Sequence, residues 1–216
     1  MQDVWKLLTL QQRYLSNHIK MKKRLLTILF LMTALFCYGQ EESGHLLFKG
    51  IPIDGTVSSF CKKLKKKGFR EIGKINGKVS LEGNFASYDK CSIIISSNLK
   101  TNMTSEVTAI FEALYSWDLL ENQYNILKRM LTIKYGEPSK VDEYFYDYKK
   151  DDPSLNESAK MAAFLTNRCK YSSLFETDKG DIYLIIVPGD LHGNVGLYYH
   201  DKINNPDIIL DALDDL

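Results

Sequence analysis

The chain has 216 residues and a formal net charge of +1, from 28 lysines and arginines against 27 acidic residues. This near-neutral balance excludes a strongly basic nucleic-acid-binding domain, which needs a clustered positive charge. Four cysteines are too few for a disulfide scaffold, so a hydrophobic core must supply most of the stability.

Residues 21–39 have the anatomy of a secretory signal peptide. Three basic residues (22–24) precede an apolar run, Leu25–Phe36, that is too short to span a bilayer. Residues 37–39 place small side chains at the −3 and −1 positions of a cleavage site. We therefore expect an exported protein, periplasmic or extracellular, whose mature chain begins at Gln40.

Residues 1–20 precede Met21, and we interpret them as a mis-assigned extension; the alternative is a long n-region with a weak amphipathic helix. Removing residues 1–39 leaves 177 residues with 22 basic and 26 acidic side chains, a net charge of −4. Phe36 is not the small residue that a lipoprotein signal needs before Cys37. No later stretch approaches the ~20 apolar residues of a membrane span, so we expect a soluble mature protein.

The first half of the mature chain, residues 40–115, predicts one helix followed by three strands. Val57, Phe60, Cys61 and Leu64 recur at helical spacing, and Gly68 ends the helix. The expected strands have alternating or β-branched side chains and cover residues 78–88, 91–96 and 106–112.

The second half, residues 116–205, opens with the clearest helix, in which Asp118 and Glu121 resemble a capping box and Gly136 is the stop. A tyrosine-rich extended segment (141–148) and a third helix ending near Thr166 follow. Three further strands are expected at residues 171–177, 181–187 and 195–200, and residues 206–216 read as a short acidic terminal helix.

These elements predict an α+β fold with one or more antiparallel sheets and helices packed on one face. Their order suggests a weak tandem repeat of one helix and three strands. With the helix ends Lys65–Phe69 and Lys134–Pro138, this order resembles the plan of the beta-lactamase inhibitor protein and of a related small lipoprotein of outer-membrane assembly. Residues 198–204 also resemble exported proteins of gut Bacteroidetes, a likeness that implies no activity.

Tyrosines are the most prominent candidate binding residues. Tyr144, Tyr146 and Tyr148 alternate, so in a strand they would share one face and form an exposed or half-exposed edge of a recognition surface. Ordinary sheet packing is the alternative. The charged residues around them favour a segment that borders solvent.

A second candidate is a lysine-rich helix surface. Lys62, Lys63 and Lys66 lie opposite the apolar side of the first helix. They form either a solvated polar face or a docking site for an anionic polymer or protein.

The cysteines of the mature chain read as small buried hydrophobes. If a disulfide forms, we expect it between Cys61 and Cys91, which leaves Cys169 free. The alternative is three reduced thiols.

We assign no catalytic residue, no metal ligand and no cofactor. His45, His192 and His200 read as surface histidines, and no nucleophile elbow, phosphate loop or Cys-x-x-Cys motif is present. The sequence therefore favours a non-enzymatic exported module that binds a protein or envelope polymer through a tyrosine-rich sheet. The competing class is a small exported hydrolase whose site is assembled from scattered residues.

Overall fold

The structure, a computed structural model, describes residues 43–146, 148, 149 and 152–205. The expected N-terminal extension, signal peptide and acidic tail lie outside the described residues. The described chain from Gly44 onward belongs to one compact unit.

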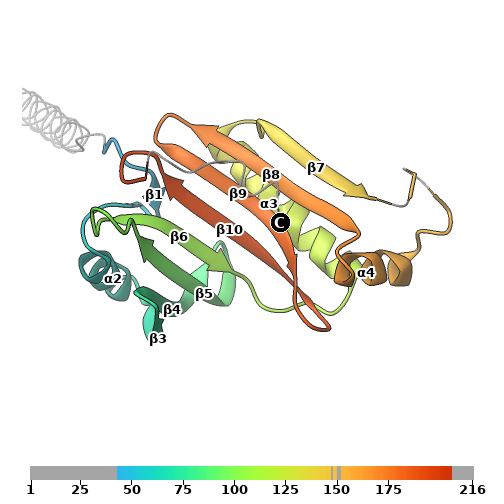
Figure 1. The fold of residues 1–216 in the computed structure, drawn as a ribbon, viewed down its shortest axis with the longest axis horizontal. Helices are drawn as coiled ribbons and strands as arrows, with labels where there is room; N and C mark the ends of the chain where they lie inside the picture. The colour runs from blue at the N-terminus through green and yellow to red at the C-terminus, as the bar shows by residue number, and fades with distance from the viewer. Residues whose placement is uncertain (1–42, 147, 150–151, 206–216) are drawn as a thin grey trace, which may run out of the picture. The chain divides into compact units, whose positions relative to one another are not determined.

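Eight antiparallel strands form one sheet in the order β3-β4-β5-β6-β10-β9-β8-β7 (Figure 1). The strands are β3 (Arg70–Ile75), β4 (Lys78–Phe85), β5 (Tyr88–Ser97), β6 (Thr104–Ile110), β7 (Lys140–Phe145), β8 (Cys169–Thr177), β9 (Gly180–Pro188) and β10 (Gly193–Asp201). A short hairpin, β1 (Leu47–Phe48) and β2 (Ile51–Pro52), precedes them. The predicted α+β fold with an antiparallel sheet is confirmed.

Each half of the chain contributes four strands rather than the three of the expected repeat. β6 and β10, the last strands of the two halves, pair at the centre of the sheet. The missed strand is β3, an edge strand with a bulge between Glu71 and Gly73. The bulge breaks the two-residue alternation on which strand prediction depends.

The helices are α2 (Val57–Lys66), α3 (Trp117–Tyr135) and α4 (Glu157–Leu165). Thr56 caps α2 by accepting a hydrogen bond from Ser59 N. A short polar residue directly before the first apolar residue of a helical repeat is a typical N-cap. The capping box expected at the start of α3 is wrong: Ser116 is the N-cap and makes no side-chain hydrogen bond. Instead Glu157 Oε1, from α4, accepts from Trp117 N at 2.9 Å.

All three helices pack on the same face of the sheet, which we call the core face. Directly paired residues of an antiparallel sheet share a face, so the register defines this one. One row runs through Leu81, Ile93, Ala109, Leu197, Leu184 and Ser173.

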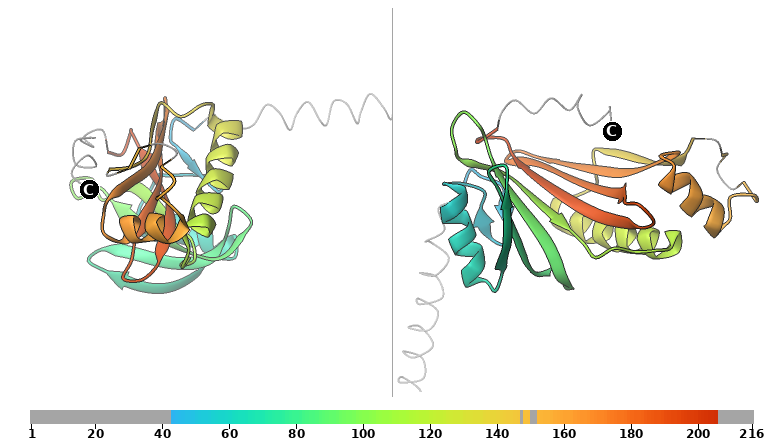
Figure 2. Two further views of the ribbon diagram at one scale, coloured as in Figure 1. Left: turned by 90° about the vertical axis from the view of Figure 1, so that its right-hand side faces the viewer. Right: turned by 60° about the horizontal axis from the view of Figure 1, so that its bottom comes forward.

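Three contacts place the helices on the core face. Tyr124 of α3 hydrogen-bonds Ser173 Oγ at 2.6 Å. Gly193 leaves room for Leu120 and Phe164, whose carbons lie 2.7 Å from where a Cβ would stand. At the other end, Val57 of α2 and Val79 of β4 line the same hollow. Figures 1 and 2 show α3 running across β8, β9 and β10.

The core lies between these helices and the sheet. Its largest fully buried side chains include Trp117, Tyr124, Phe48, Phe60 and Phe111. Among the described residues, each helix is too short or too polar to cross a lipid bilayer.

Candidate binding surface

The second face of the sheet, which we call the open face, is not covered by any helix among the described residues. The register runs one row through Ile94, Thr108, Tyr198 and Tyr183, and the next through Ile110, Gly196 and Ile185. Further members are Tyr144, Leu174, Val187 and Asn194.

Apolar and aromatic side chains occupy the centre of the open face. Ile94, Ile110, Tyr183, Ile185 and Tyr198 are all partly exposed. An antiparallel sheet with one solvated face normally alternates apolar and polar residues. Here the alternation brings isoleucine and tyrosine to the face without a helix, which is typical of a surface that meets a partner.

Tyr198 marks the middle of this surface. Its ring folds over Gly196, whose missing Cβ would lie 3.0 Å from Tyr198 Cε2. Its register partner on β9 is Tyr183, so two tyrosines stand side by side. Burial of the Tyr198 ring raises the pKa of its hydroxyl, which stays neutral at physiological pH.

The predicted tyrosine cluster lies at the β7 edge of the open face. Tyr144 pairs with Lys170 in register and is 43 % exposed, and Tyr146 is 59 % exposed. Their rings meet edge to face, with centroids 5.2 Å apart. Burial, helped by the hydrogen bond and the charge of Tyr146, raises the pKa of Tyr144.

Tyr148 does not join this pair. Strand β7 ends at Phe145, so the two-residue alternation does not continue to Tyr148. Tyr148 is half-buried and packs against the hydrophobic core. The structure thus places Tyr144 on the same face of the sheet as Tyr198 and Tyr183, and of these the sequence reasoning had not considered Tyr183.

The lysines of α2 lie elsewhere. Lys62, Lys63 and Lys66 are exposed, as their helical spacing predicts. Because α2 packs on the core face, these lysines and the open face lie on opposite sides of the sheet. The two predicted binding clusters therefore do not form one surface.

The three cysteines that the structure describes are free thiols, and Cys61 and Cys91 are both buried. Cys91 Sγ donates to the carbonyls of the β4–β5 turn, with Tyr88 O at 3.6 Å and Phe85 O at 3.8 Å. Burial raises the pKa of the Cys61 thiol, and the carboxylate of Glu71 on β3 adds to the effect. The two thiols thus sit in different surroundings, and the Cys61–Cys91 bridge stays a prediction.

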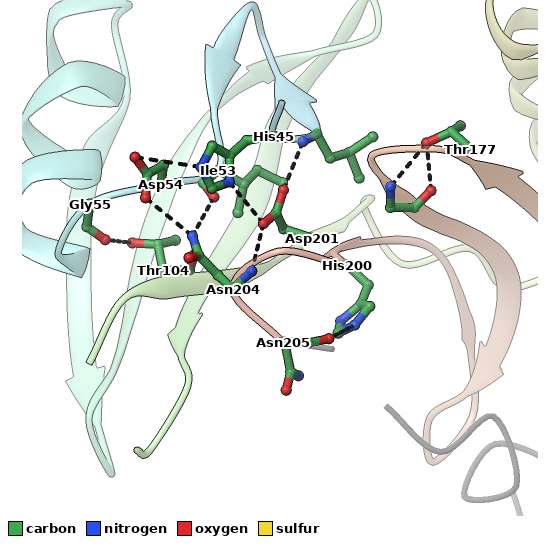
Figure 3. A network of polar contacts seen from close by, with 12 residues as sticks. His45, Ile53, Asp54, Gly55, Thr104, Thr177, His200, Asp201, Asn204 and Asn205 are labelled. Atoms are coloured by element: carbon green, nitrogen blue, oxygen red, sulfur yellow. Dashed lines mark hydrogen bonds and ion pairs between the residues drawn. The ribbon is translucent and has the colours of Figure 1, made fainter. Parts of the chain in front are cut away.

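A buried polar network fastens the end of β10 to the start of the described chain (Figure 3). Asp201 is fully buried; its Oδ1 accepts from Leu46 N at 2.7 Å, and its Oδ2 contacts His45 Nδ1 at 3.0 Å. Asn204 N also donates to Asp201 Oδ2, at 3.0 Å.

Asn204 extends the network to β6 and to the turn before α2. Its Nδ2 lies within hydrogen-bond distance of Thr104 O at 3.0 Å and Asp54 Oδ1 at 3.2 Å. Burial acts to raise the pKa of Asp54, but hydrogen bonds from Gly55 and Asn204 outweigh it, and the pKa is lowered.

Sequence reasoning missed this network, because it joins residues about 150 positions apart. The interpretation of the histidines as surface residues is wrong for His200, which is 4 % exposed, and His45 is held within the network. Asp54 and Asp201 on either side of His45 form a structural clamp. The backbone amides of Leu46 and Asn204 donate to Asp201 in this clamp.

A shallow hollow of about 390 Å³ lies between α2 and the β3–β4 turn. Its lining includes Val57, Ser58, Lys74 and Asn76 and contains no histidine, cysteine or carboxylate. Within the described ranges, His, Cys, Asp and Glu side chains do not form a group of three that could hold a metal ion. Comparisons with protein-family models, curated proteins and solved structures found no match for this chain.

Proposed function

We propose that this protein is an exported, non-enzymatic binding module that recognises a partner protein through the open face. The observation that carries the proposal is the pair of register rows that place Ile94, Tyr198, Tyr183, Ile110 and Ile185 on the face without a described helix. Tyrosine favours binding surfaces because it contributes a large rigid area and keeps one polar group.

The surroundings of these rows have the composition of a protein interface, with an apolar centre and a charged rim. Lys170 and Asp142 form an ion pair at 3.6 Å beside Tyr144. Glu106 and Asp181 flank the opposite end of the strands, next to His200. A mixed rim favours a protein partner over a uniformly anionic envelope polymer, which would favour a basic surface.

The size of the open face also suits a protein. Six strand spacings of about 4.8 Å and strand segments of about 20 Å give an area on the order of 600 Å². A standard interface buries about 800 Å² on each partner. Edge residues such as Tyr144 and Tyr146 would supply the remainder.

Export and the tandem plan belong to the same proposal. Export is supported by the signal-peptide anatomy of residues 21–39. The resemblance to the beta-lactamase-inhibitor-protein plan is supported by the element order of the two halves. The first provides α2 and four strands of the sheet, and the second provides α3, α4 and four strands. For the hydrolase alternative, the α2 hollow would need a paired nucleophile and base. Its described lining residues include no histidine, cysteine or carboxylate, and Ser58 makes no hydrogen bond to Lys74 or Lys78 among them.

The test is site-specific photocrosslinking in the envelope fraction. A benzophenone side chain replaces Tyr144 or Tyr198 on the open face, and Tyr115, which is 71 % exposed, serves as the matched control. We expect the open-face positions to give the same covalent adduct with one protein, and Tyr115 to give none. That protein is then identified and purified for titration.

Three results would overturn the proposal: adducts only from Tyr115, adducts with a polymer ladder instead of one protein, or equal adducts from all positions. Export is checked separately by intact mass after expression from Met21. A chain that starts near Gln40 supports it, and a retained Leu25–Phe36 segment or a lipid on Cys37 contradicts it.

A further inference from the structure

The positive charge of the described chain is concentrated in one stretch, from α2 to β4. Between Val57 and Glu82 there are eight lysines and arginines and two acidic residues, a net charge of +6. The other described residues carry 13 basic and 16 acidic side chains, a net charge of −3. Because α2 lies beside β3 and β4 (Figure 1), this end of the molecule has a positive potential that attracts anions.

Part of this charge lies on one side of α2, the side that faces β3. Lys65 Nζ donates to Glu71 Oε2 on β3 at 2.6 Å. Ser58 and Lys62 lie on the same side of the helix, since they precede Lys65 by seven and three residues. Lys74 Nζ, further along β3, lies 3.6 Å from Glu71 Oε1. The hydrogen bond from Lys65 and the charges of the two lysines lower the pKa of Glu71.

The hollow of about 390 Å³ lies between this side of α2 and the β3–β4 turn. Its volume is within the range of small-molecule sites. Its lining combines two valines, a hydroxyl, an amide and two ammonium groups, which belong to Val57, Val79, Ser58, Asn76, Lys74 and Lys78. None of the described lining residues supplies a negative charge, so the hollow suits an anionic ligand with a neutral polar part.

A phosphate group fits the charge of this site better than a carboxylate does. Four lysines lie in the hollow or on the adjoining side of α2: Lys62, Lys65, Lys74 and Lys78. After Glu71 is subtracted, three positive charges remain. A phosphate monoester carries about −1.5 to −2 charges at pH 7, whereas a carboxylate carries one. Lysine binds phosphate as a point charge, and the Ser58 hydroxyl and the Asn76 amide can donate to further oxygens.

We propose that the hollow between α2 and the β3–β4 turn is a phosphate-binding site in which Lys74 and Lys78 hold the anion. The phosphate is the free ion or belongs to a small polar molecule such as a sugar, whose neutral part lies against Val57 and Val79. This site does not depend on the proposed function. Because α2 packs on the core face, the phosphate ligand and the partner protein occupy opposite sides of the sheet.

Amide NMR of the mature chain tests the site with defined probes. Glucose 6-phosphate, inorganic phosphate, glucuronate and glucose are titrated separately at one ionic strength. We expect glucose 6-phosphate to shift the amide signals of Ser58, Asn76 and Gly77 in a saturable way at millimolar concentration, and glucose to shift none of them. The amides of Thr108 and Tyr198 on the open face are the internal control and should stay in place.

Two variants of equal charge sharpen the test. K74Q/K78Q removes both ammonium groups from the hollow and should weaken phosphate binding at least about tenfold, because two charge-assisted contacts are lost. K90Q/K149Q removes the same charge from two exposed lysines outside the lining of the hollow and should bind phosphate normally. All four lysines are exposed, so both variants should stay folded, which the dispersion of the amide signals checks.

The probes also separate the two sources of phosphate. Tighter binding of glucose 6-phosphate than of inorganic phosphate would assign the site to a phosphorylated sugar, and equal binding would keep the phosphate site and assign it to the free ion.

Four results would overturn the proposal: no shift at the hollow, equal shifts with glucuronate, unchanged binding in K74Q/K78Q, or equal weakening in K90Q/K149Q. The open-face variant Y183S/Y198S should bind glucose 6-phosphate normally. A failure of the phosphate site is therefore distinguishable from a failure of the proposed protein-binding surface.

Discussion

The same strands supply the side chains of both faces of the sheet, but one face is buried and the other is partly exposed. On β9, Ile182, Leu184 and Ile186 are buried under helices, whereas the alternate residues Tyr183 and Ile185 are partly exposed on the open face. The side-chain types are nearly the same on both faces, so hydrophobicity alone does not separate core from surface. Within the described part of the chain, the helices cover the core face and not the open face, and this difference separates core from surface.

The difference implies that substitutions on adjacent residues of one strand should have separable effects. Core-face changes should alter the free energy of unfolding, and open-face changes should alter binding.

The Asp201 clamp should be the most sensitive position. Asp201→Ala removes the buried acceptor that the Leu46 and Asn204 amides and His45 Nδ1 share. A buried donor left without its acceptor costs about 1–3 kcal/mol, so the loss of the shared acceptor should cost at least about 3 kcal/mol in total. Urea denaturation should show this loss, and Glu106→Gln, which removes a half-exposed charge near His200, should change stability little.

Leu184 and Ile185 compare the two faces directly, because they are neighbours on β9. Leu184→Ala removes a fully buried side chain and should cost about 2–5 kcal/mol. Ile185→Ala should cost well under half of that. Equal losses of unfolding free energy in urea would mean that the open face is as tightly covered as the core face.

Alkaline pH should weaken the core face through Cys169. Burial raises the pKa of this thiol to about 12, above its ordinary value near 9. A thiol whose pKa is higher in the folded state stabilises fully below the unfolded pKa, and this contribution disappears as pH rises from about 9 to 12.

Cys169→Ser provides the control, because the serine hydroxyl does not titrate in this range. Its unfolding free energy should fall less steeply between pH 9 and pH 12 than that of the parent chain. Parallel curves would show that the thiol titrates normally in the folded protein.

The link between α3 and α4 should have a moderate effect. Glu157→Ala removes the acceptor for Trp117 N and should cost about 1 kcal/mol, as the loss of a helix cap does. Asp118→Ala tests the capping box that the sequence suggested and should cost less. If thermal unfolding showed a larger loss for Asp118→Ala than for Glu157→Ala, the result would favour the local capping box over the contact with Glu157.

The α2 lysines should have the smallest effect. Replacing Lys62, Lys63 and Lys66 with serine should change stability by less than about 0.5 kcal/mol, as is usual for exposed positions. Partner binding should also persist, because α2 lies across the sheet from the open face. Loss of partner binding in this variant would indicate that the interface lies on α2 rather than on the open face.

Sequence reasoning located the elements whose pattern is local. The apolar spacing of α2 and α3 and the alternation of β4, β5 and β8 to β10 mark them within a few residues. It missed β3, whose bulge interrupts the period, and it misplaced the cap of α3, whose partner Glu157 lies 40 residues away.

The candidate site was predictable only in part. Alternation identified Tyr144, but it could not show that β7 ends before Tyr146 and Tyr148. Tyr183 and Tyr198 lie inside predicted strands, but a sequence does not state which face of a strand a helix covers, so it could not place them on the open face. The contact of His45 with Asp201 depends on chain closure over 156 positions.

The most direct test of the account is the affinity of the purified partner for the mature chain and for the variant Y183S/Y198S, with Y115S as the matched control. We predict that Y183S/Y198S stays folded and binds at least about tenfold more weakly, as expected for central aromatic contacts, whereas Y115S binds normally. Unchanged affinity in folded Y183S/Y198S would contradict the claim that the open face is the binding surface.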